Sequence, residues 1–342
     1  KDSIRCGVVG YGGAFNMGKM HLNSMALNAR MEVAAVCEID DARRKVAPKD
    51  FPGIQTYAKI EDMIKYGELD LVTIITPHNT HASLAIKCLK AGINVVSEKP
   101  MAITSKEVKD MMRAAKQNKV MLSTFHNRRW DGDFTTLRDL IRKEKLIGRV
   151  HRIEAGFYSY AEQGSWWRSN RIISGGAIYD WGAHFTDWIL NIVPENIDWV
   201  SGYQVKNKQW KGYTNEDHSE YSLRFSGGTI ATLTISNLSM SGRPRWRVLG
   251  EKGSIEHMGN RPGGVSGDKF EVNALVNGRQ MRTEVPFAES NWNSYYQNVY
   301  KHLEGRAKLI ITPESAARVI GVLEAANVSA RRKSQPVKPA FV

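Results

Sequence analysis

The chain has 342 residues, of which 42% are hydrophobic and 24% charged. This length suits two domains, and the composition is typical of a globular protein without a membrane span. Its three cysteines are scattered, so we expect neither a disulfide framework nor a cysteine metal site, and a reducing, cytoplasmic compartment is favoured. Because the chain begins with Lys1, a removed signal and periplasmic export remain open.

The formal net charge of +13 raises the question of nucleic-acid binding. The basic residues are spread along the chain with carboxylates between them, and no basic helix with interleaved aromatic residues occurs. We therefore expect no nucleic-acid partner and no membrane partner. The excess charge favours solubility and some attraction for anionic ligands.

Residues 1–125 alternate between short apolar runs and helical patterns. Near-continuous apolar strands that are separated by helices are typical of a parallel sheet covered on both faces. We therefore predict a Rossmann-type dinucleotide-binding domain. Its predicted strands are residues 6–9, 33–37, 69–75, 94–97 and 120–125, and its predicted helices include 18–29, 82–89 and one that begins with a capping box at Thr104 and Glu107.

Residues 126–342 have a different pattern, with alternating apolar positions and a strong hairpin signal at Asn277–Gly278. The pattern predicts an α/β substrate-binding domain with an open, mostly antiparallel sheet and helices near 176–192, 293–304 and 313–331. All nine tryptophans lie at or after Trp130, which suits a sugar-binding face, with a bulky core as the alternative. The open sheet also offers a face for a homo-oligomer, either a dimer or a tetramer.

A glycine-rich loop follows the first predicted strand and opens a helix. Such a loop lets backbone N–H groups approach a pyrophosphate, although the third glycine, Gly18, comes later than in the usual G-x-G-x-x-G spacing. Glu38 ends the second strand, where a carboxylate binds the ribose hydroxyls of NAD and repels a 2′-phosphate. Arg43 and Arg44 follow closely and keep NADP open. The loop residues expected at the cofactor are Gly10, Gly12, Gly13, Ala14, Phe15, Asn16 and Met17.

Four further segments resemble the Gfo/Idh/MocA family of glucose-fructose oxidoreductases and inositol dehydrogenases. They are Thr76-Pro77-His78-Asn79-Thr80-His81, Glu98-Lys99-Pro100, Asn127-Arg128-Arg129, and the segment from Trp167-Arg168 through Gly175-Gly176 to Asp180, Gly182, His184 and Asp187. The resemblance implies a two-domain fold and hydride transfer between NAD or NADP and a secondary alcohol. It implies that Lys99 lies near the nicotinamide, that His184 is the acid/base, and that Asp180 is catalytic and binds substrate. It adds to the cofactor site Thr76, Pro77, His78, His81, Glu98, Lys99 and Asn127.

The residues around His184 support these roles independently. In a helix that begins near Gly176, Asp180 and His184 share a narrow stripe with Asp187 and Asn191, beside an apolar face. A solvated polar face is the alternative, but the stripe contains neither Lys nor Glu. A facial-triad metal site is another alternative, but no second ligand cluster accompanies it, so we expect no metal.

The substrate site is predicted from the residues that precede this helix. Trp166, Trp167 and Arg168 are expected to form part of the cleft together with Lys99, Asp180 and His184. For Arg168 a structural ion pair is an equal alternative, and His81 has packing or helix capping as its alternative. Lys99 follows a parallel strand, at the edge where such sheets bind ligands, although most lysines are surface residues.

The sequence thus predicts an NAD(P)-dependent enzyme that acts on a sugar, glycoside or cyclitol. His184 would take the hydroxyl proton, Lys99 would stabilise the same oxygen, and Asp180 would orient the substrate. Two alternatives remain. One is NAD-dependent glycoside cleavage through transient oxidation, and the other is a cofactor-binding sensor without turnover.

Overall fold

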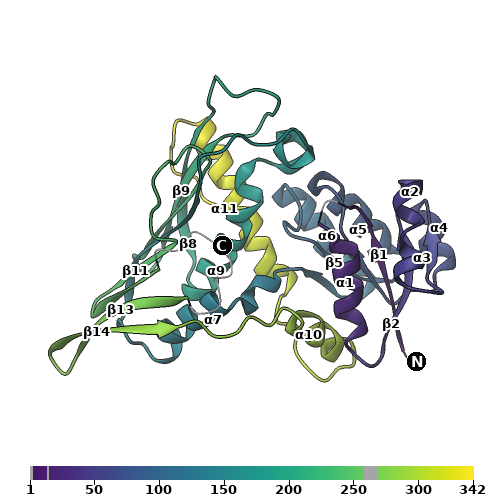
Figure 1. Cartoon of the computed structure of the whole chain (residues 1–342), viewed down its shortest axis with the longest axis horizontal. Coiled ribbons are helices and arrows are strands. Elements are labelled where there is room, and N and C mark those ends of the chain that lie inside the picture. The colour runs from purple at the N-terminus through teal and green to yellow at the C-terminus, as the bar shows by residue number, and fades with distance from the viewer. Residues whose placement is uncertain (1–2, 14, 258–267) are drawn as a thin grey trace. The chain divides into compact units, whose positions relative to one another are not determined.

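The computed structural model describes residues 3–13, 15–257 and 268–342. It consists of two compact units (Figure 1). The first unit contains Lys1–His126 and Asn293–Ala316, and the second contains Asn127–Trp292 and Ala317–Val342. The sequence prediction places a domain boundary after residue 125 and the segment 293–316 in the second domain, whereas in the structure this segment packs within the first unit.

The first unit contains a six-stranded sheet in the order β3-β2-β1-β4-β5-β6. All its strand pairs are parallel, as expected for a dinucleotide-binding fold. Strand β3 has no buried residue and therefore no apolar run, so the sequence pattern does not predict it. The strands are β1 (Ile4–Val9), β2 (Met31–Cys37), β3 (Gln55–Tyr57), β4 (Leu71–Ile74), β5 (Asn94–Ser97) and β6 (Leu122–Thr124).

Helices join these strands. The predicted capping box is confirmed, since Thr104 Oγ1 accepts the Glu107 N–H at 3.2 Å and Glu107 Oε2 accepts the Thr104 N–H at 2.9 Å. Helix α10 is in this unit because its Tyr295 and Tyr296 are buried against Phe125. The helices are α1 (Met17–Ala26), α2 (Asp41–Arg44), α3 (Ala47–Asp50), α4 (Ile60–Tyr66), η1 (His78–Thr80), α5 (His81–Lys90), α6 (Ser105–Asn118) and α10 (Ser294–Leu303).

The second unit is built on an eight-stranded sheet in the order β14-β13-β12-β11-β7-β10-β9-β8. Every pair is antiparallel except β7 with β10, which confirms the predicted mainly antiparallel sheet. The expected hairpin at Asn277–Gly278 joins β13 and β14. The strands are β7 (Val150–Tyr158), β8 (Ile197–Val205), β9 (His218–Phe225), β10 (Ile230–Ser236), β11 (Trp246–Gly250), β12 (Gly253–His257), β13 (Lys269–Val276) and β14 (Arg279–Pro286).

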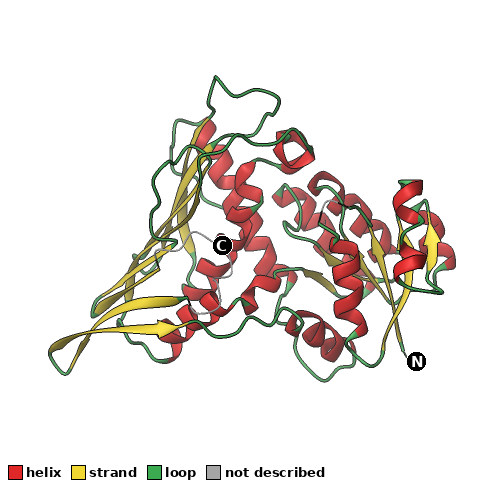
Figure 2. Cartoon of the chain, viewed as in Figure 1, coloured by secondary structure: helices red, strands yellow, loops and turns green. Residues whose placement is uncertain are grey.

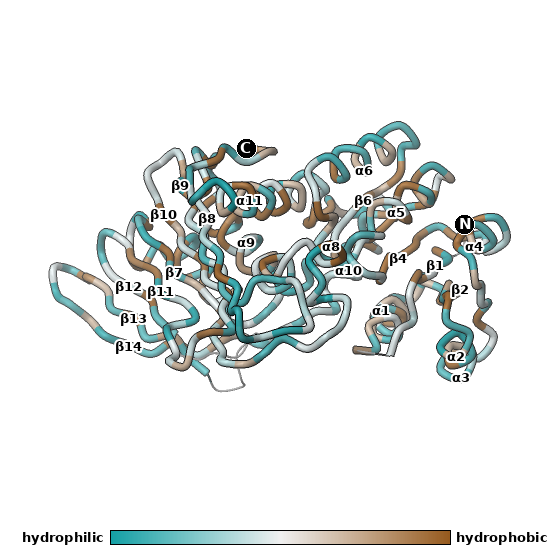
Figure 3. The backbone as a smooth tube through the Cα atoms, turned by 90° about the horizontal axis from the view of Figure 1, so that it is seen from above, coloured by the Kyte–Doolittle hydropathy of each residue, from teal (hydrophilic) through white to brown (hydrophobic). Residues whose placement is uncertain are grey.

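Helices of the second unit pack on one face of this sheet (Figure 2). Rings of Phe185, Trp188 and Trp246 meet at 5.3–5.7 Å and form the centre of its core. The outermost strand β14 is hydrophilic, whereas α11 carries much hydrophobic sequence (Figure 3). The helices are η2 (Asn127–Trp130), α7 (Gly132–Arg138), η3 (Asp139–Lys143), η4 (Trp167–Ser169), α8 (Arg171–Ser174), η5 (Ala177–Tyr179), α9 (Trp181–Ile192) and α11 (Pro313–Arg331).

No helix in the described part of the chain is long and apolar enough to span a bilayer. The same part of the chain contains no group of three or more His, Cys, Asp or Glu side chains arranged to hold a metal ion.

Candidate functional site

The glycine-rich loop has the geometry of a phosphate cradle. Gly10 has a φ of +102°, and a Cβ there would lie 2.3 Å from the carbonyl oxygen of Ile75. A Cβ on Gly18 would lie 2.7 Å from the Tyr11 ring and 2.8 Å from the Gly10 oxygen. Gly18 therefore permits close packing of helix against strand, which is the role of the third glycine in the usual motif, despite its late position.

The extra residues of this loop lie ahead of α1. Asn16 takes a left-handed conformation with φ of 51°, and within the described structure its side chain makes no cap hydrogen bond to the helix. The Asn16 side chain therefore leaves the first-turn N–H groups of α1 uncapped at the end where an anion is favoured. Phe15 is exposed beside this end. Ala14, also predicted at the cofactor, lies outside the described residues.

Glu38 lies next to the loop, directly after β2. Its Oε2 accepts the Tyr11 N–H at 2.7 Å, and its Oε1 accepts the Asp40 N–H at 2.9 Å. Two backbone donors thus fix the carboxylate beside the glycine loop. Arg43 approaches the same loop, since its Nη1 lies 3.2 Å from the position of a Cβ on Gly12.

The loop after β4 contains Thr76, Pro77, His78 and His81. His81 is fully buried, and its Nδ1 and Nε2 each lie 2.8 Å from a carbonyl oxygen, those of Pro100 and Thr76 respectively. These contacts give His81 a structural role, and cofactor binding by it stays a prediction. His78 is also buried, with its ring centroid 5.7 Å from that of His81.

Lys99 follows β5 and is partly buried. Its N–H donates to Oε2 of the buried Glu98 at 2.8 Å, and Oε1 of Glu98 lies 3.1 Å from Nε2 of His21. Burial alone would raise the pKa of the Glu98 carboxyl. The hydrogen bond from His21 and the positive charges of His21 and Lys99 outweigh burial and hold this pKa below its usual range.

The second unit contains the other two predicted catalytic residues. Asp180 is the N-cap residue of α9, and His184 lies one turn further along, nearly buried. The His184 ring centroid lies 5.3 Å from that of Trp181 and 6.1 Å from that of Trp188. His184 is therefore nearly buried and lies in contact with two indole rings.

Arg168 connects the predicted substrate residues of this unit. It forms an ion pair with Asp180 at 3.0 Å, and its guanidinium carbon lies 5.4 Å and 4.8 Å from the ring centroids of Trp166 and Trp167. Asn215 Nδ2 donates to the Arg168 carbonyl oxygen at 2.7 Å and so fixes the backbone of this loop. The structure brings Trp166, Trp167, Arg168 and Asp180 together, and their place in a substrate cleft stays a prediction.

The ionisable stripe of α9 divides into two parts with different environments. Asp187 is buried in a two-bonded ion pair with Arg129, with N···O distances of 2.8 Å and 2.6 Å. Asn191 Nδ2 donates back to the Asp187 carbonyl oxygen at 2.7 Å. These two residues are therefore structural, and Asp180 and His184 remain the candidates for chemistry. Asn127, predicted at the cofactor, is buried at the start of η2.

The sequence analysis missed an arginine between two indoles. The Arg128 guanidinium carbon lies 4.8 Å from the Trp181 ring centroid and 4.9 Å from that of Trp292. Arg128 also pairs with Asp131 at 2.9 Å. Burial raises the pKa of Asp131, against the charge of Arg128, which lowers it. Arg128 therefore packs against Trp181, which in turn contacts His184. In the sequence, the Asn127-Arg128-Arg129 segment was the feature that could have identified Arg128.

The residues predicted to bind the cofactor and those predicted to bind and deprotonate the substrate therefore belong mainly to different units. The first unit contains the cradle, Glu38 and Lys99, and the second contains Asp180, His184 and the tryptophan pair. The tight backbone approach at Gly10 and Gly18, and the start of α1 that the Asn16 side chain does not cap, fit a dinucleotide pyrophosphate.

Comparisons with known proteins cover both units. Residues 4–126 match the model of an oxidoreductase family with an NAD-binding Rossmann fold, and residues 138–338 match that family's C-terminal alpha/beta domain. The chain is 25% identical to scyllo-inositol 2-dehydrogenase (NADP(+)) IolW of Bacillus subtilis, over 97% of this chain and 95% of that protein. It is 33% identical to the rhizopine catabolism protein MocA of Rhizobium meliloti, over 74% of this chain and 78% of that protein.

A solved structure agrees with these matches. The NAD-binding protein from Listeria innocua superimposes with a TM-score of 0.85 at 26% identity, covering 99% of this chain and 97% of that one. Because the family models together span most of the sequence, the chain belongs to the Gfo/Idh/MocA family of NAD(P)-dependent oxidoreductases.

Proposed function

We propose that the protein oxidises a secondary alcohol of a cyclitol or sugar, or reduces the corresponding ketone, with His184 as the acid/base. One observation carries this proposal. His184 is nearly buried between indole rings, one helical turn from the Arg168–Asp180 pair, in a chain whose other unit has a dinucleotide cradle. A shielded imidazole beside polar binding groups suits proton transfer near neutral pH.

In oxidation, the carbinol C–H bond and the O–H bond both break as the carbonyl forms. Bound NAD(P) supplies the nicotinamide that accepts the hydride. His184 accepts the hydroxyl proton, and Lys99 donates a hydrogen bond that stabilises the charge developing on the oxygen. Asp180, held by Arg168, orients the substrate by accepting a hydroxyl hydrogen bond. In reduction, His184 returns the proton.

The tryptophans support a polyol substrate. Trp166 is exposed and Trp167 partly so, and both are fixed by Arg168, so their rings offer apolar faces beside a charged pair. Sugar and cyclitol rings present both C–H faces and hydroxyl edges, which match such a wall. The inositol dehydrogenase named among the relatives supports the same substrate class.

NADH formation at 340 nm over a panel of inositols and hexoses tests the proposal. His184→Ala should lower turnover by about 10²–10⁴-fold while NADH affinity stays intact. The exposed His151 provides a matched control, and His151→Ala should leave turnover unchanged. Near-wild-type turnover of His184→Ala between pH 6 and 9 would contradict the assignment. Release of an aglycone without net NADH would indicate glycoside cleavage, and NADH binding without turnover on any panel member would indicate a sensor.

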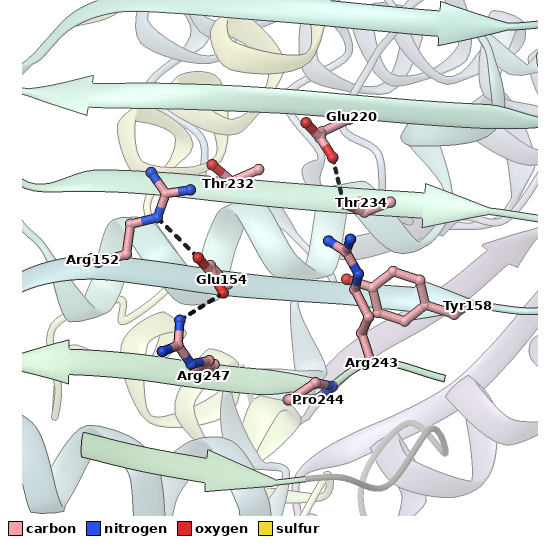
Figure 4. Close-up of a pocket in the computed structure, with 9 residues that line it drawn as sticks. All are labelled: Arg152, Glu154, Tyr158, Glu220, Thr232, Thr234, Arg243, Pro244 and Arg247. Carbon is pink, nitrogen blue, oxygen red and sulfur yellow. Dashed lines mark hydrogen bonds and ion pairs between the residues drawn. The ribbon is translucent and has the colours of Figure 1, made fainter. Parts of the chain in front are cut away.

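The proposal also includes the compartment and the assembly. The described cysteines are free and buried, which suits a reducing cytoplasm. For assembly, the sheet face opposite the helices carries a polar hollow lined by charged residues (Figure 4). Glu154 pairs there with Arg152 at 3.2 Å and Arg247 at 3.1 Å. Adjacent opposite charges allow this face to pair with a second copy about a two-fold axis.

Light scattering tests this homo-oligomer. Glu154→Lys, which leaves like charges together on this face, should reduce the measured mass toward that of one chain. Asp110→Lys, on α6 of the other unit, should not. An unchanged mass for Glu154→Lys would show that this face is not the interface.

A further inference from the structure

The backbone around Lys99 is connected to the cofactor helix α1 by a buried polar chain. His21 of α1 is fully buried, with Nε2 3.1 Å from Glu98 Oε1 and Nδ1 2.7 Å from the Tyr296 hydroxyl. The Tyr296 hydroxyl lies 2.9 Å from Thr73 Oγ1 on β4. The other oxygen of Glu98 accepts the Lys99 N–H. Two helices and two strand regions of the first unit thus meet in one connected set of hydrogen bonds.

The proton positions in this chain follow from its chemistry. An ionised carboxylate only accepts, so His21 Nε2 donates to Glu98. His21 Nδ1 accepts the Tyr296 proton if the imidazole is neutral and donates to the Tyr296 oxygen if it is protonated, and Thr73 Oγ1 can donate or accept to complete the chain in either case. Every polar group of the chain is satisfied in both arrangements. A satisfied buried network is rigid, and loss of one member leaves another buried group unpaired.

Packing holds His21 in the orientation that this network needs. The His21 ring centroid lies 4.2 Å from that of Phe125 and 5.8 Å from that of Tyr296. On the other side of Lys99, His81 holds the Pro100 carbonyl oxygen at 2.8 Å. Two buried histidines therefore fix the main chain before and after Lys99, and one of them belongs to the helix that opens at the glycine loop.

We propose that Glu98, His21 and Tyr296 are positioning residues that fix Lys99 and couple its backbone to α1, so that cofactor binding at the start of α1 orders Lys99. This inference rests on the proposed function for its role in turnover. The coupling itself concerns contacts within the first unit and can be measured without a substrate.

Hydrogen exchange of the Lys99 amide, measured by mass spectrometry on peptides covering 97–101, tests the proposal in the full chain. Tyr296→Phe removes the hydroxyl and keeps the ring. It should speed exchange at Lys99 by about tenfold, as expected for the loss of one net hydrogen bond of support. His21→Leu should have a larger effect, and His21→Gln, which keeps a donor for Glu98, should restore most of the protection.

Tyr295→Phe is the matched control. Tyr295 is equally buried on the same helix, but its hydroxyl bonds Ser123 at 2.9 Å, outside the network. This variant should leave exchange at Lys99 within about twofold of wild type, because local protection depends on local contacts. Equal exchange rates at Lys99 in Tyr295→Phe and Tyr296→Phe would overturn the proposal. They would show that the packing of this helix, and not the hydrogen-bond network, determines protection at Lys99.

Hydrogen exchange at Lys99 in the presence of NADH provides a second test. Saturating NADH should slow Lys99 exchange in wild type and in Tyr295→Phe, and should do so less in Tyr296→Phe. If calorimetry detects no NADH binding to wild type, the proposed function fails, while the variant series still decides whether the network positions Lys99. If NADH binds and Lys99 exchange does not respond in wild type, the coupling is absent. With a turned-over alcohol, Tyr296→Phe should lower kcat more than it raises the KM for NAD.

Discussion

At the residue scale, we expect Glu38 to decide the cofactor preference. Its carboxylate is fixed by the N–H groups of Tyr11 and Asp40, at the place where a dinucleotide fold binds the adenine ribose. A fixed negative charge repels a 2′-phosphate, whereas Arg43 beside Gly12 attracts one. We expect Glu38 to dominate, because it is buried and held by two donors.

Calorimetric titration with NADH and NADPH checks this preference. NADH should bind more tightly to wild type. Glu38→Gln should reduce the discrimination mainly by improving NADPH binding, and Arg43→Ala should weaken NADPH binding more than NADH binding. The NADP(+)-using relative IolW makes the test informative, since NADPH binding at least as tight as NADH binding would refute the role of Glu38.

Glu98 should make the stability of the protein depend on acid pH. Its folded-state pKa lies below the ordinary value of 4.5, despite burial, because of His21 and Lys99. A depressed folded pKa means that the unfolded chain binds the proton first as pH falls. The stabilisation is therefore complete above about pH 4.5 and is lost as pH falls through the lower, folded-state pKa.

Urea unfolding of wild type and Glu98→Gln between pH 3 and 7 measures this dependence. Wild type should be more stable near pH 7, and the difference should shrink toward pH 3. Glu61→Gln, which removes an exposed carboxylate paired with Lys87, should give a smaller pH-dependent difference because water screens exposed pairs. A constant difference for Glu98→Gln across the range would show that charge at Glu98 is not responsible.

At the element scale, the buried Arg129–Asp187 pair anchors α9 to the segment that begins the second unit. Removing one partner leaves a buried charge unpaired, which typically destabilises a protein by about 3–5 kcal/mol. Arg129→Ala or Asp187→Ala should therefore lower unfolding free energy by about that amount. The Lys106–Asp110 pair lies at the surface, where water screens it and its contribution should be much smaller, so Lys106→Ala is the control in the same denaturant titration. Similar losses for Arg129→Ala and Lys106→Ala would contradict this anchor.

The elements also show which features a sequence can predict. Parallel strands such as β4 were predicted because continuous burial produces an apolar run, whereas β3 at the sheet edge has no such run. The helix predicted to begin near Gly176 places Asp180, His184 and Asp187 on one stripe, whereas α9 begins at Trp181 with Asp180 as its non-helical N-cap residue. Periodicity also does not identify the partners of these residues. Arg129, distant in sequence, makes Asp187 structural.

Contacts between distant segments explain the remaining differences. The sequence pattern groups helix α10 with the second domain, whereas the buried contacts of Tyr295 and Tyr296 with Phe125 place it in the first unit. His21 was missed for the same reason. It lies within a predicted helix, and its partner Glu98 comes from a different strand end.

At the scale of the whole molecule, the proposed chemistry draws on both units. Lys99 belongs to the unit with the dinucleotide cradle, and His184 belongs to the unit with the tryptophan pair. If both residues act on one substrate oxygen, removing the second should matter less once the first is gone. When two residues act together on one step, the rate losses of their single variants do not multiply in the double variant. The rate losses of residues that act independently do multiply.

Turnover of Lys99→Ala, His184→Ala and the double variant on an identified alcohol measures this coupling. Each single variant should lose about 10²–10⁴-fold in kcat, and the double variant should lose clearly less than the product of the two. NADH affinity serves as the control, since His184→Ala should leave it intact. A double variant whose loss equals the product would show that the two residues contribute independently, and the assignment of both to one oxygen would then be wrong.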